Sequence, residues 1–207
     1  MSRLFSQAIS EGDGISIVPL LDGDVEALAG AVAAAGAEAI AVRSSAQVER
    51  ARPSTDLPIV VRELVRDHES LRAAHDAGAD ACTFVFGELE DEDELLEELY
   101  AEAIDLGLDV AIGVRDEDEL ERSLERVDPE ILVLAERGSG EEEHAEELER
   151  TFELLSDVPV GKLVIAESSV VTRAQILALE RAGVDAVLVT GLPAGQLLTV
   201  LAELTGR

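Results

Sequence analysis

Short apolar runs alternate eight times with longer amphipathic segments, and this alternation limits the possible folds more than any other feature of the chain. The apolar runs predict strands at residues 15–20, 39–42, 59–61, 81–86, 110–112, 131–134, 163–166 and 186–189. The segments that follow them predict helices at residues 24–35, 46–51, 68–77, 92–106, 117–126, 142–155, 173–182 and 194–204. Strict alternation of strands and helices predicts a parallel sheet, either closed as a (β/α)8 barrel or open and doubly wound.

A short repeat marks four junctions where a helix ends and a strand begins. It reads AGAEA at residues 35–39, AGADA at 77–81, LGLDV at 106–110 and AGVDA at 182–186. Glycine suits the left-handed position that ends a helix. An open sheet is expected to carry a glycine-rich phosphate loop after its first strand, whereas this chain has PLLDGD at residues 19–24. We therefore predict a compact (β/α)8 TIM barrel over residues 15–207, preceded by a lead-in (1–14) that seats one helical turn under the barrel.

Polar residues follow two consecutive apolar runs near the C-terminus. Glu167, Ser168 and Ser169 follow the seventh run, and Thr190 and Gly191 follow the eighth. In a parallel barrel, the carboxyl ends of the strands form the face where ligands bind. Backbone amides of residues 190 and 191, ahead of the last predicted helix, are expected to hold an anion.

These stretches also carry a family resemblance. Residues 164–170 (VIAESSV) followed by 182–189 (AGVDAVLV) resemble the seventh and eighth strand segments of indole-3-glycerol phosphate synthase. Residues 57–64, 106–117 and 130–137 resemble its third, fifth and sixth strand segments. The resemblance runs from about residue 15 to the C-terminus and lacks most of the family's extended N-terminal region. It implies a barrel that closes an indole ring by decarboxylation and dehydration of a carboxyphenylamino-deoxyribulose phosphate.

The chain departs from the family at most catalytic positions. The family uses lysines on strands one and three and glutamates on strands one, five and seven. Here strand one ends in VPLL (residues 18–21), Arg62 replaces the strand-three lysine, Gly113 replaces the strand-five glutamate, and Ala135 replaces a strand-six asparagine. Arginine keeps the positive charge but hardly releases a proton, because its pKa exceeds about 12.

The remaining polar residues supply the candidate site. Glu167 and Arg62 are the candidate catalytic residues. The candidate ligand-binding residues are Ser168, Ser169, Thr190, Gly191, Arg137 and Glu63. A structural ion pair between Arg62 and Glu63 is an equal alternative to a ligand role, and Glu167 has the alternative of a solvated strand-end carboxylate.

Three functions remain open. The first is a diverged barrel that binds a small phosphorylated or carboxylated ligand at the C-terminal face without synthase activity. The second is a non-catalytic interaction or regulatory pseudoenzyme, and the third is an active synthase, a carbon–carbon lyase of tryptophan biosynthesis. The missing lysines and glutamates oppose the third. A polar mouth favours the first, whereas a mouth filled by Leu20, Leu21 and Leu192 favours the second.

The charge of the chain is strongly negative. There are 45 acidic residues against 16 basic ones, for a net charge of −29. Such self-repulsion destabilises a compact state at low ionic strength, and salt screens it. The acids recur in nearly every predicted helix, so the sequence favours adaptation to a high-salt cytoplasm over an acidic patch for a basic partner. We expect no nucleic-acid partner, because phosphate backbones bind positive surfaces.

The rarer residue types add no further chemistry. We expect no metal and no cofactor, because His68, His75 and His144 have no partner set in the sequence. Cys82 is expected to be a small buried hydrophobe, and residues 88–98 a solvated acidic helix face. Lys162, the single lysine, is expected at the bottom of the barrel. The absence of a signal peptide and of a long apolar run predicts a cytoplasmic protein without a membrane segment.

Overall fold

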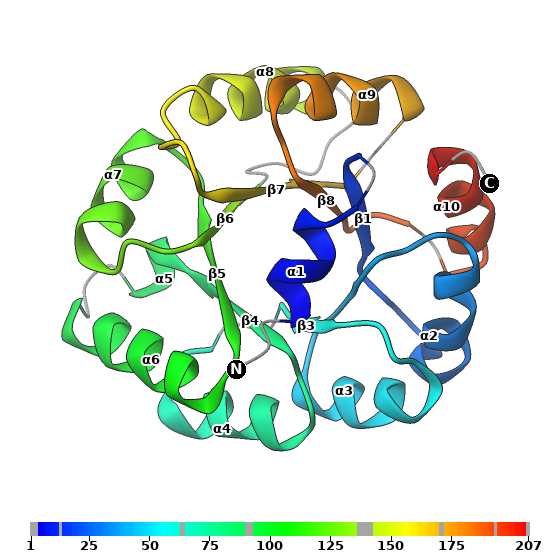
Figure 1. Ribbon diagram of the computed structural model, residues 1–207, viewed down its shortest axis with the longest axis horizontal. Helices are drawn as coiled ribbons and strands as arrows, with labels where there is room; N and C mark the ends of the chain where they lie inside the picture. The colour runs from blue at the N-terminus through cyan, green and yellow to red at the C-terminus, as the bar shows by residue number, and fades with distance from the viewer. Residues whose placement is uncertain are drawn as a thin grey trace.

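A computed structural model describes residues 4–12, 14–62, 65–89, 93–135, 143–169, 172–192 and 194–205. In this part of the chain, eight parallel strands form a barrel wall and helices surround it (Figure 1). The strands are β1 (Ser16–Pro19), β2 (Ile40–Val42), β3 (Ile59–Val61), β4 (Ala81–Val85), β5 (Asp109–Val114), β6 (Ile131–Leu134), β7 (Leu163–Ser168) and β8 (Ala186–Val189). The helices are α1 (Leu4–Ser10), α2 (Val25–Ala34), α3 (Ser45–Ala51), the 3-10 helix η1 (Arg52–Ser54), α4 (His68–Asp76), α5 (Phe86–Leu89), α6 (Asp93–Leu106), α7 (Glu117–Arg126), α8 (Glu143–Leu155), α9 (Arg173–Ala182) and α10 (Leu197–Thr205).

The strands pair in the order β1-β8-β7-β6-β5-β4-β3-β2. The two ends of this order meet through a bridge between Leu20 and Ala41, where the Leu21 N–H donates to the Ala41 carbonyl at 2.9 Å. This bridge brings β1 beside β2 and nearly closes the ring. The predicted (β/α)8 TIM barrel is therefore confirmed.

Both faces of the sheet are buried, which explains why the strands are apolar without alternation. On β8, Ala186 and Leu188 belong to the cluster inside the barrel. Val187 and Val189 belong to a cluster with the surrounding helices. Successive side chains of a strand therefore point alternately into the barrel and toward the helices. The same alternation, continued past each strand, determines which side chains reach the barrel mouth.

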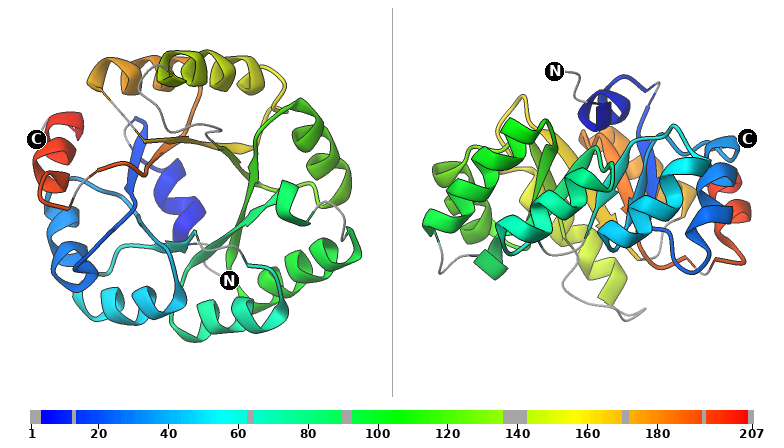
Figure 2. Two further views of the ribbon diagram at one scale, coloured as in Figure 1. Left: turned by 180° about the vertical axis from the view of Figure 1, so that it is seen from behind. Right: turned by 90° about the horizontal axis from the view of Figure 1, so that it is seen from below.

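Helix α1 covers the end of the barrel where the strands begin (Figure 2). Phe5 and Ile9 are 0% and 1% exposed and pack into the interior cluster. Each such buried side chain contributes about 1.5–3 kcal/mol. The backbone N–H of Ser6 donates to Oδ2 of the buried Asp109 at 2.7 Å, so α1 is also tied to the start of β5. The helix spans residues 4–10, which is longer than the single turn that the sequence predicts.

The four-fold repeat has a structural role at the same end. Its glycines, at positions 36, 78, 107 and 183, all have positive φ, as predicted. Its acidic residue, which the sequence left unexplained, accepts a backbone hydrogen bond in each case. Glu38 accepts from the N–H of Ile17, Asp80 from Ile59, Asp109 from Ser6 and Asp185 from Val164, at 3.0, 2.8, 2.7 and 2.7 Å. Three of these bonds reach the start of the preceding strand, so the repeat fastens neighbouring strands together.

Two boundaries differ from the sequence prediction in a way that affects the site. Strand β7 continues through Glu167 and Ser168, because these residues stay in parallel register with Leu188 and Val189 of β8. Intrinsic propensity does not reveal this, since strand preference depends on the neighbouring strand. The last helix begins at Leu197 instead of residue 194, consistent with the low helix propensity of Gly195.

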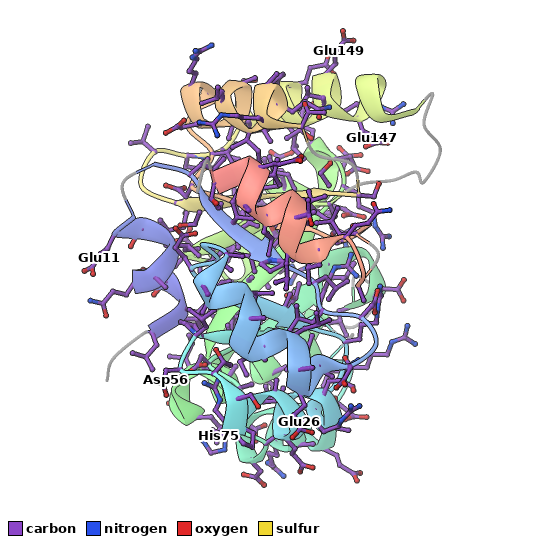
Figure 3. All side chains as sticks on the ribbon, turned by 90° about the vertical axis from the view of Figure 1, so that its right-hand side faces the viewer. Glu11, Glu26, Asp56, His75, Glu147 and Glu149 are labelled. Atoms are coloured by element: carbon purple, nitrogen blue, oxygen red, sulfur yellow. The ribbon has the colours of Figure 1, made fainter. Side chains whose placement is uncertain are left out.

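The outer surface of the helix ring carries acidic side chains. Figure 3 labels four acidic residues of the surface, Glu26 on α2, Glu149 on α8, Glu11 after α1 and Asp56 after η1. All four are exposed. Among the described residues, no helix is both long enough and apolar enough to cross a membrane.

Candidate functional site

Two arginines lie side by side at the barrel mouth, at the ends of β2 and β3. Arg43 follows Val42 and Arg62 follows Val61, and these two valines are paired in the sheet. The Arg62 N–H donates to the Val42 carbonyl at 2.8 Å, which extends the pairing to the arginines. Each arginine falls on the inward side of the alternation, two positions after the interior residue Ala41 or Val60. Both guanidinium groups therefore belong to the mouth.

Arg62 forms an ion pair with Glu167. Its Nη2 donates to Oε1 of Glu167, which lies on the inward side of β7, two positions after Ile165. The Glu167 side chain is 8% exposed and that of Arg62 is 30% exposed. Within the described residues, Nε and Nη1 of Arg62 have no hydrogen-bond partner. A partly buried, charge-assisted contact of this kind holds Arg62 across the mouth while leaving donors available.

Arg43 forms a two-point ion pair with Asp22, which follows β1. Its Nε and Nη2 donate to Oδ1 and Oδ2 of Asp22 at 2.8 and 3.0 Å. The hydrogen bond from Arg43 is the main cause that lowers the pKa of Asp22, and partial burial opposes it. The bond to Asp22 in turn raises the pKa of Arg43, and the charge of Glu167 adds to this increase. The Glu167 carboxylate, which Arg62 binds, therefore also interacts electrostatically with Arg43.

Sequence reasoning missed Asp22 and Arg43. The available signal was position, because Arg43 stands directly after its strand, as Arg62 does. The two other candidates on this face, Glu63 and Arg137, lie outside the described residues. The alternative Arg62–Glu63 pair therefore also lies outside the described residues, whereas the contact of Arg62 with Glu167 is present.

The ends of β7 and β8 form the neighbouring edge of the mouth. The Thr190 N–H donates to the Ser168 carbonyl at 2.9 Å, which corrects the expectation that this amide is available to an anion. Thr190 lies two positions after the interior residue Leu188, so its side chain falls on the inward side of the barrel wall. A Cβ on Gly191 would lie 2.0 Å from the Ser169 carbonyl oxygen, so the chain approaches itself too closely here for any other residue. This close approach positions Ser169 and Thr190 on one edge.

The positions where the family places its other catalytic groups carry no ionisable side chain. Gly113 lies in β5, and a Cβ there would meet the Phe84 carbonyl oxygen at an ordinary 3.5 Å. Ala135 follows β6. Lys162 precedes β7 at the opposite end of the barrel, as predicted, and its Nζ lies 2.5 Å from Asp128 Oδ1.

The leucines considered as a plug do not fill the mouth. Leu20 belongs to the interior cluster, below the level of Asp22. Leu21 is fully buried on the helix side of the sheet, and Leu192 packs against the same cluster. The inward positions at the strand ends are therefore taken largely by charged and hydroxyl side chains.

The remaining candidates lie away from the mouth. His68 contacts Glu102 through Nδ1 and lies 3.6 Å from Glu98 through Nε2, so it does have acidic partners, contrary to the sequence expectation. Burial raises the pKa of the Cys82 thiol to about 12, in keeping with a buried hydrophobe. In the part of the chain that is described, no group of three or more His, Cys, Asp or Glu residues is arranged to hold a metal ion.

Comparisons with known proteins agree with this architecture. A solved structure described as the N-acetylmannosamine-6-phosphate 2-epimerase from Clostridium perfringens is similar, with a TM-score of 0.68 and 14% sequence identity. The similarity covers 93% of this chain and 92% of that one, and it shows a shared fold. A sequence model of indole-3-glycerol phosphate synthase matches residues 21–193, which is most of the chain and includes the charged residues of the mouth. The chain therefore belongs to the indole-3-glycerol phosphate synthase family.

Proposed function

We propose that the barrel mouth binds a small phosphorylated or carboxylated ligand and that the chain does not catalyse indole-ring closure. The observation that carries this proposal is the Arg62–Glu167 ion pair. Arg62 stands in place of the family's strand-three lysine, and its guanidinium group binds anions well and releases protons poorly.

Three features support binding. The mouth lies at the carboxyl ends of the strands, where barrel proteins bind their ligands. Arg62 keeps donors that have no partner within the described residues. Ser169 and Thr190 stand on the adjacent edge, from which hydroxyl groups can donate to an oxyanion. The structurally similar epimerase, whose name includes a sugar phosphate, is consistent with this ligand class. This polar mouth favours a ligand site over a regulatory scaffold.

The absence of turnover follows from proton chemistry. Decarboxylation and dehydration need a positioned general acid and base whose pKa values lie near the working pH. Arg62 is a poor general acid, because a guanidinium group hardly releases a proton. Gly113 has no carboxylate to offer, and Lys162 contacts Asp128 at the far end of the barrel. Glu167 is paired with Arg62 and lacks a partner acid at the matching family positions.

We also propose that the chain is adapted to a high-salt cytoplasm. The net charge of −29 and the exposed acidic side chains of the surface support this proposal (Figure 3). High salt screens the repulsion between these exposed charges and leaves buried pairs largely intact.

Calorimetric titration with the synthase substrate in molar KCl tests the binding. The folded wild-type chain is expected to bind it saturably, and Arg62→Ala to weaken binding by about tenfold, because a hydrogen bond to a charged group contributes about 1.5–3 kcal/mol. Arg72→Ala is the matched control. Arg72 lies on α4 and pairs with Glu102 at the surface, so its removal makes the same charge change away from the mouth. Lack of saturable binding, or equal weakening by both variants, would overturn the proposal.

A further inference from the structure

We infer that Arg43 and Arg62 form a single two-guanidinium site for one oxyanion, a carboxylate or a phosphate, and that the carboxylates of Asp22 and Glu167 compete with this ligand for the guanidinium groups. The inference rests on the proposed function, since it assumes that the mouth binds an anion. It adds which side chains hold that anion and which compete with it. Neither Arg43 nor Asp22 stands at one of the catalytic positions that the family resemblance identifies.

The first step is the placement of the two arginines. They follow paired valines on adjacent strands, and both fall on the inward side of the barrel. Adjacent strands are about 4.8 Å apart, so two guanidinium groups on neighbouring positions are within reach of one oxyanion. Two like charges this close need compensating anions, and Asp22 and Glu167 supply them.

The second step is the use of the guanidinium donors. Arg43 uses Nε and Nη2 to bind Asp22. Arg62 uses Nη2 to bind Glu167. In the described residues, Nη1 of Arg43 and both Nε and Nη1 of Arg62 are without a hydrogen-bond partner. The planar fork of guanidinium donors matches the geometry of carboxylate and phosphate, which defines the class of ligand.

The third step is the charge balance. Two arginines and two carboxylates give the site no net charge, so an incoming anion adds excess negative charge unless a carboxylate leaves its arginine. Asp22 is 46% exposed and can turn into solvent at little cost. Glu167 is 8% exposed and has no such escape, so it remains close to the bound anion. Neutralising either carboxylate should therefore strengthen ligand binding.

Titrations of the intact chain in molar KCl, followed by NMR, test this inference. The probes are inorganic phosphate and benzoate, which separate a phosphate from a carboxylate site. We expect Arg43→Ala to weaken the binding of at least one probe about tenfold, as one lost charge-assisted hydrogen bond implies. Asp22→Asn and Glu167→Gln should strengthen it several-fold. Two matched controls, Arg72→Ala on α4 and Glu149→Gln on the exposed face of α8, should leave it unchanged (Figure 3).

A second readout does not depend on any variant folding. The Arg43 Nε–H is bonded to Asp22 in the unliganded chain, so its ¹⁵N–¹H signal should shift as the probe saturates the site. The outcomes separate the two proposals. If the wild type binds a probe but the Arg43 signal stays fixed and Arg43→Ala binds normally, the two-arginine site is wrong and the proposed function stands. Weaker binding by both Asp22→Asn and Glu167→Gln would also overturn it. If neither probe nor the synthase substrate binds the folded wild type, both proposals fail.

Discussion

The Arg62 guanidinium donates to the Glu167 carboxylate, joining the ends of two strands, β3 and β7, that lie on opposite sides of the barrel. The two residues are 105 positions apart in the chain. The pair therefore requires the sheet to curve so that β3 faces β7, and it spans the mouth at the level of the proposed ligand site. It stands where the family uses a lysine as proton donor, which makes the mouth suited to holding an anion.

A side chain at position 191 should disrupt the edge formed by the ends of β7 and β8. Gly191→Ala places a Cβ 2.0 Å from the Ser169 carbonyl oxygen, so the two segments must move apart. We expect a loss of about 1–3 kcal/mol in the free energy of unfolding, as for other overpacked sites, together with weaker ligand binding. Gly195→Ala is the control, because no atom lies within 4 Å of a Cβ there. Thermal unfolding measures both variants, and equal midpoints would count against the close approach.

Much of the barrel follows from the sequence, because strand and helix periods and the helix-ending glycines are local properties. Glu167 and Arg62 could likewise be predicted as strand-end residues. Their pairing could not, since it depends on how the sheet curves. Asp22 and Arg43 could have been predicted as site residues from their positions after β1 and β2. They do not stand at the family's catalytic positions, so the resemblance does not point to them.

The bottom of the barrel shows the same limit. The acidic residue of the repeat was visible in the sequence, but its role as an acceptor for a neighbouring strand depends on which strands are adjacent. Asp109 illustrates this, because it binds the Ser6 N–H of α1 instead of a strand. Only the docked position of α1 determines that contact.

Two substitutions at Asp185 should separate its hydrogen bond from its charge. Burial raises the pKa of Asp185, and the bond from the Val164 N–H opposes the increase. A raised pKa means that the protonated form favours folding. This contribution is complete below the unfolded-state pKa of about 3.9 and is lost as the pH rises through the folded-state value.

At neutral pH, Asp185→Asn should therefore cost little, since it keeps an acceptor oxygen without the charge. Asp185→Ala leaves the Val164 N–H without this acceptor and should cost about 1–3 kcal/mol. Denaturant unfolding compares the two, with substitutions at the 80% exposed Asp76 as controls. Equal losses for Asn and Ala would contradict this account of Asp185.

The Asp22–Arg43 pair predicts a pH dependence of the opposite sign. The hydrogen bond from Arg43 lowers the pKa of Asp22, so this stabilisation is present above the unfolded-state value of about 3.9 and is lost as the pH falls through the folded-state value. The effect on stability is small, because both side chains are about half exposed and screened by solvent. Carboxyl ¹³C NMR should show Asp22 titrating below pH 3.9, and Arg43→Ala should return it toward that value. An unchanged midpoint in the variant would remove Arg43 as the cause.

Stability should increase steeply with KCl into the molar range. The net charge of −29 makes the folded chain repel itself, and the Debye length falls from about 10 Å at 0.1 M salt to about 3 Å at 1 M. Thermal unfolding at low and molar KCl is the measurement. A midpoint that stays constant or falls with salt would rule out salt adaptation.

The central claim is that the mouth holds an anion but has lost the proton donors for ring closure. The most direct test is indole fluorescence from the folded chain mixed with the carboxyphenylamino-deoxyribulose phosphate substrate in molar KCl. The chain contains no tryptophan, so its own indole signal does not mask the product. We predict no measurable indole formation at saturating substrate. Turnover near the median enzyme rate of about 10 per second would contradict the claim and show that this chain closes the ring without the family's lysines.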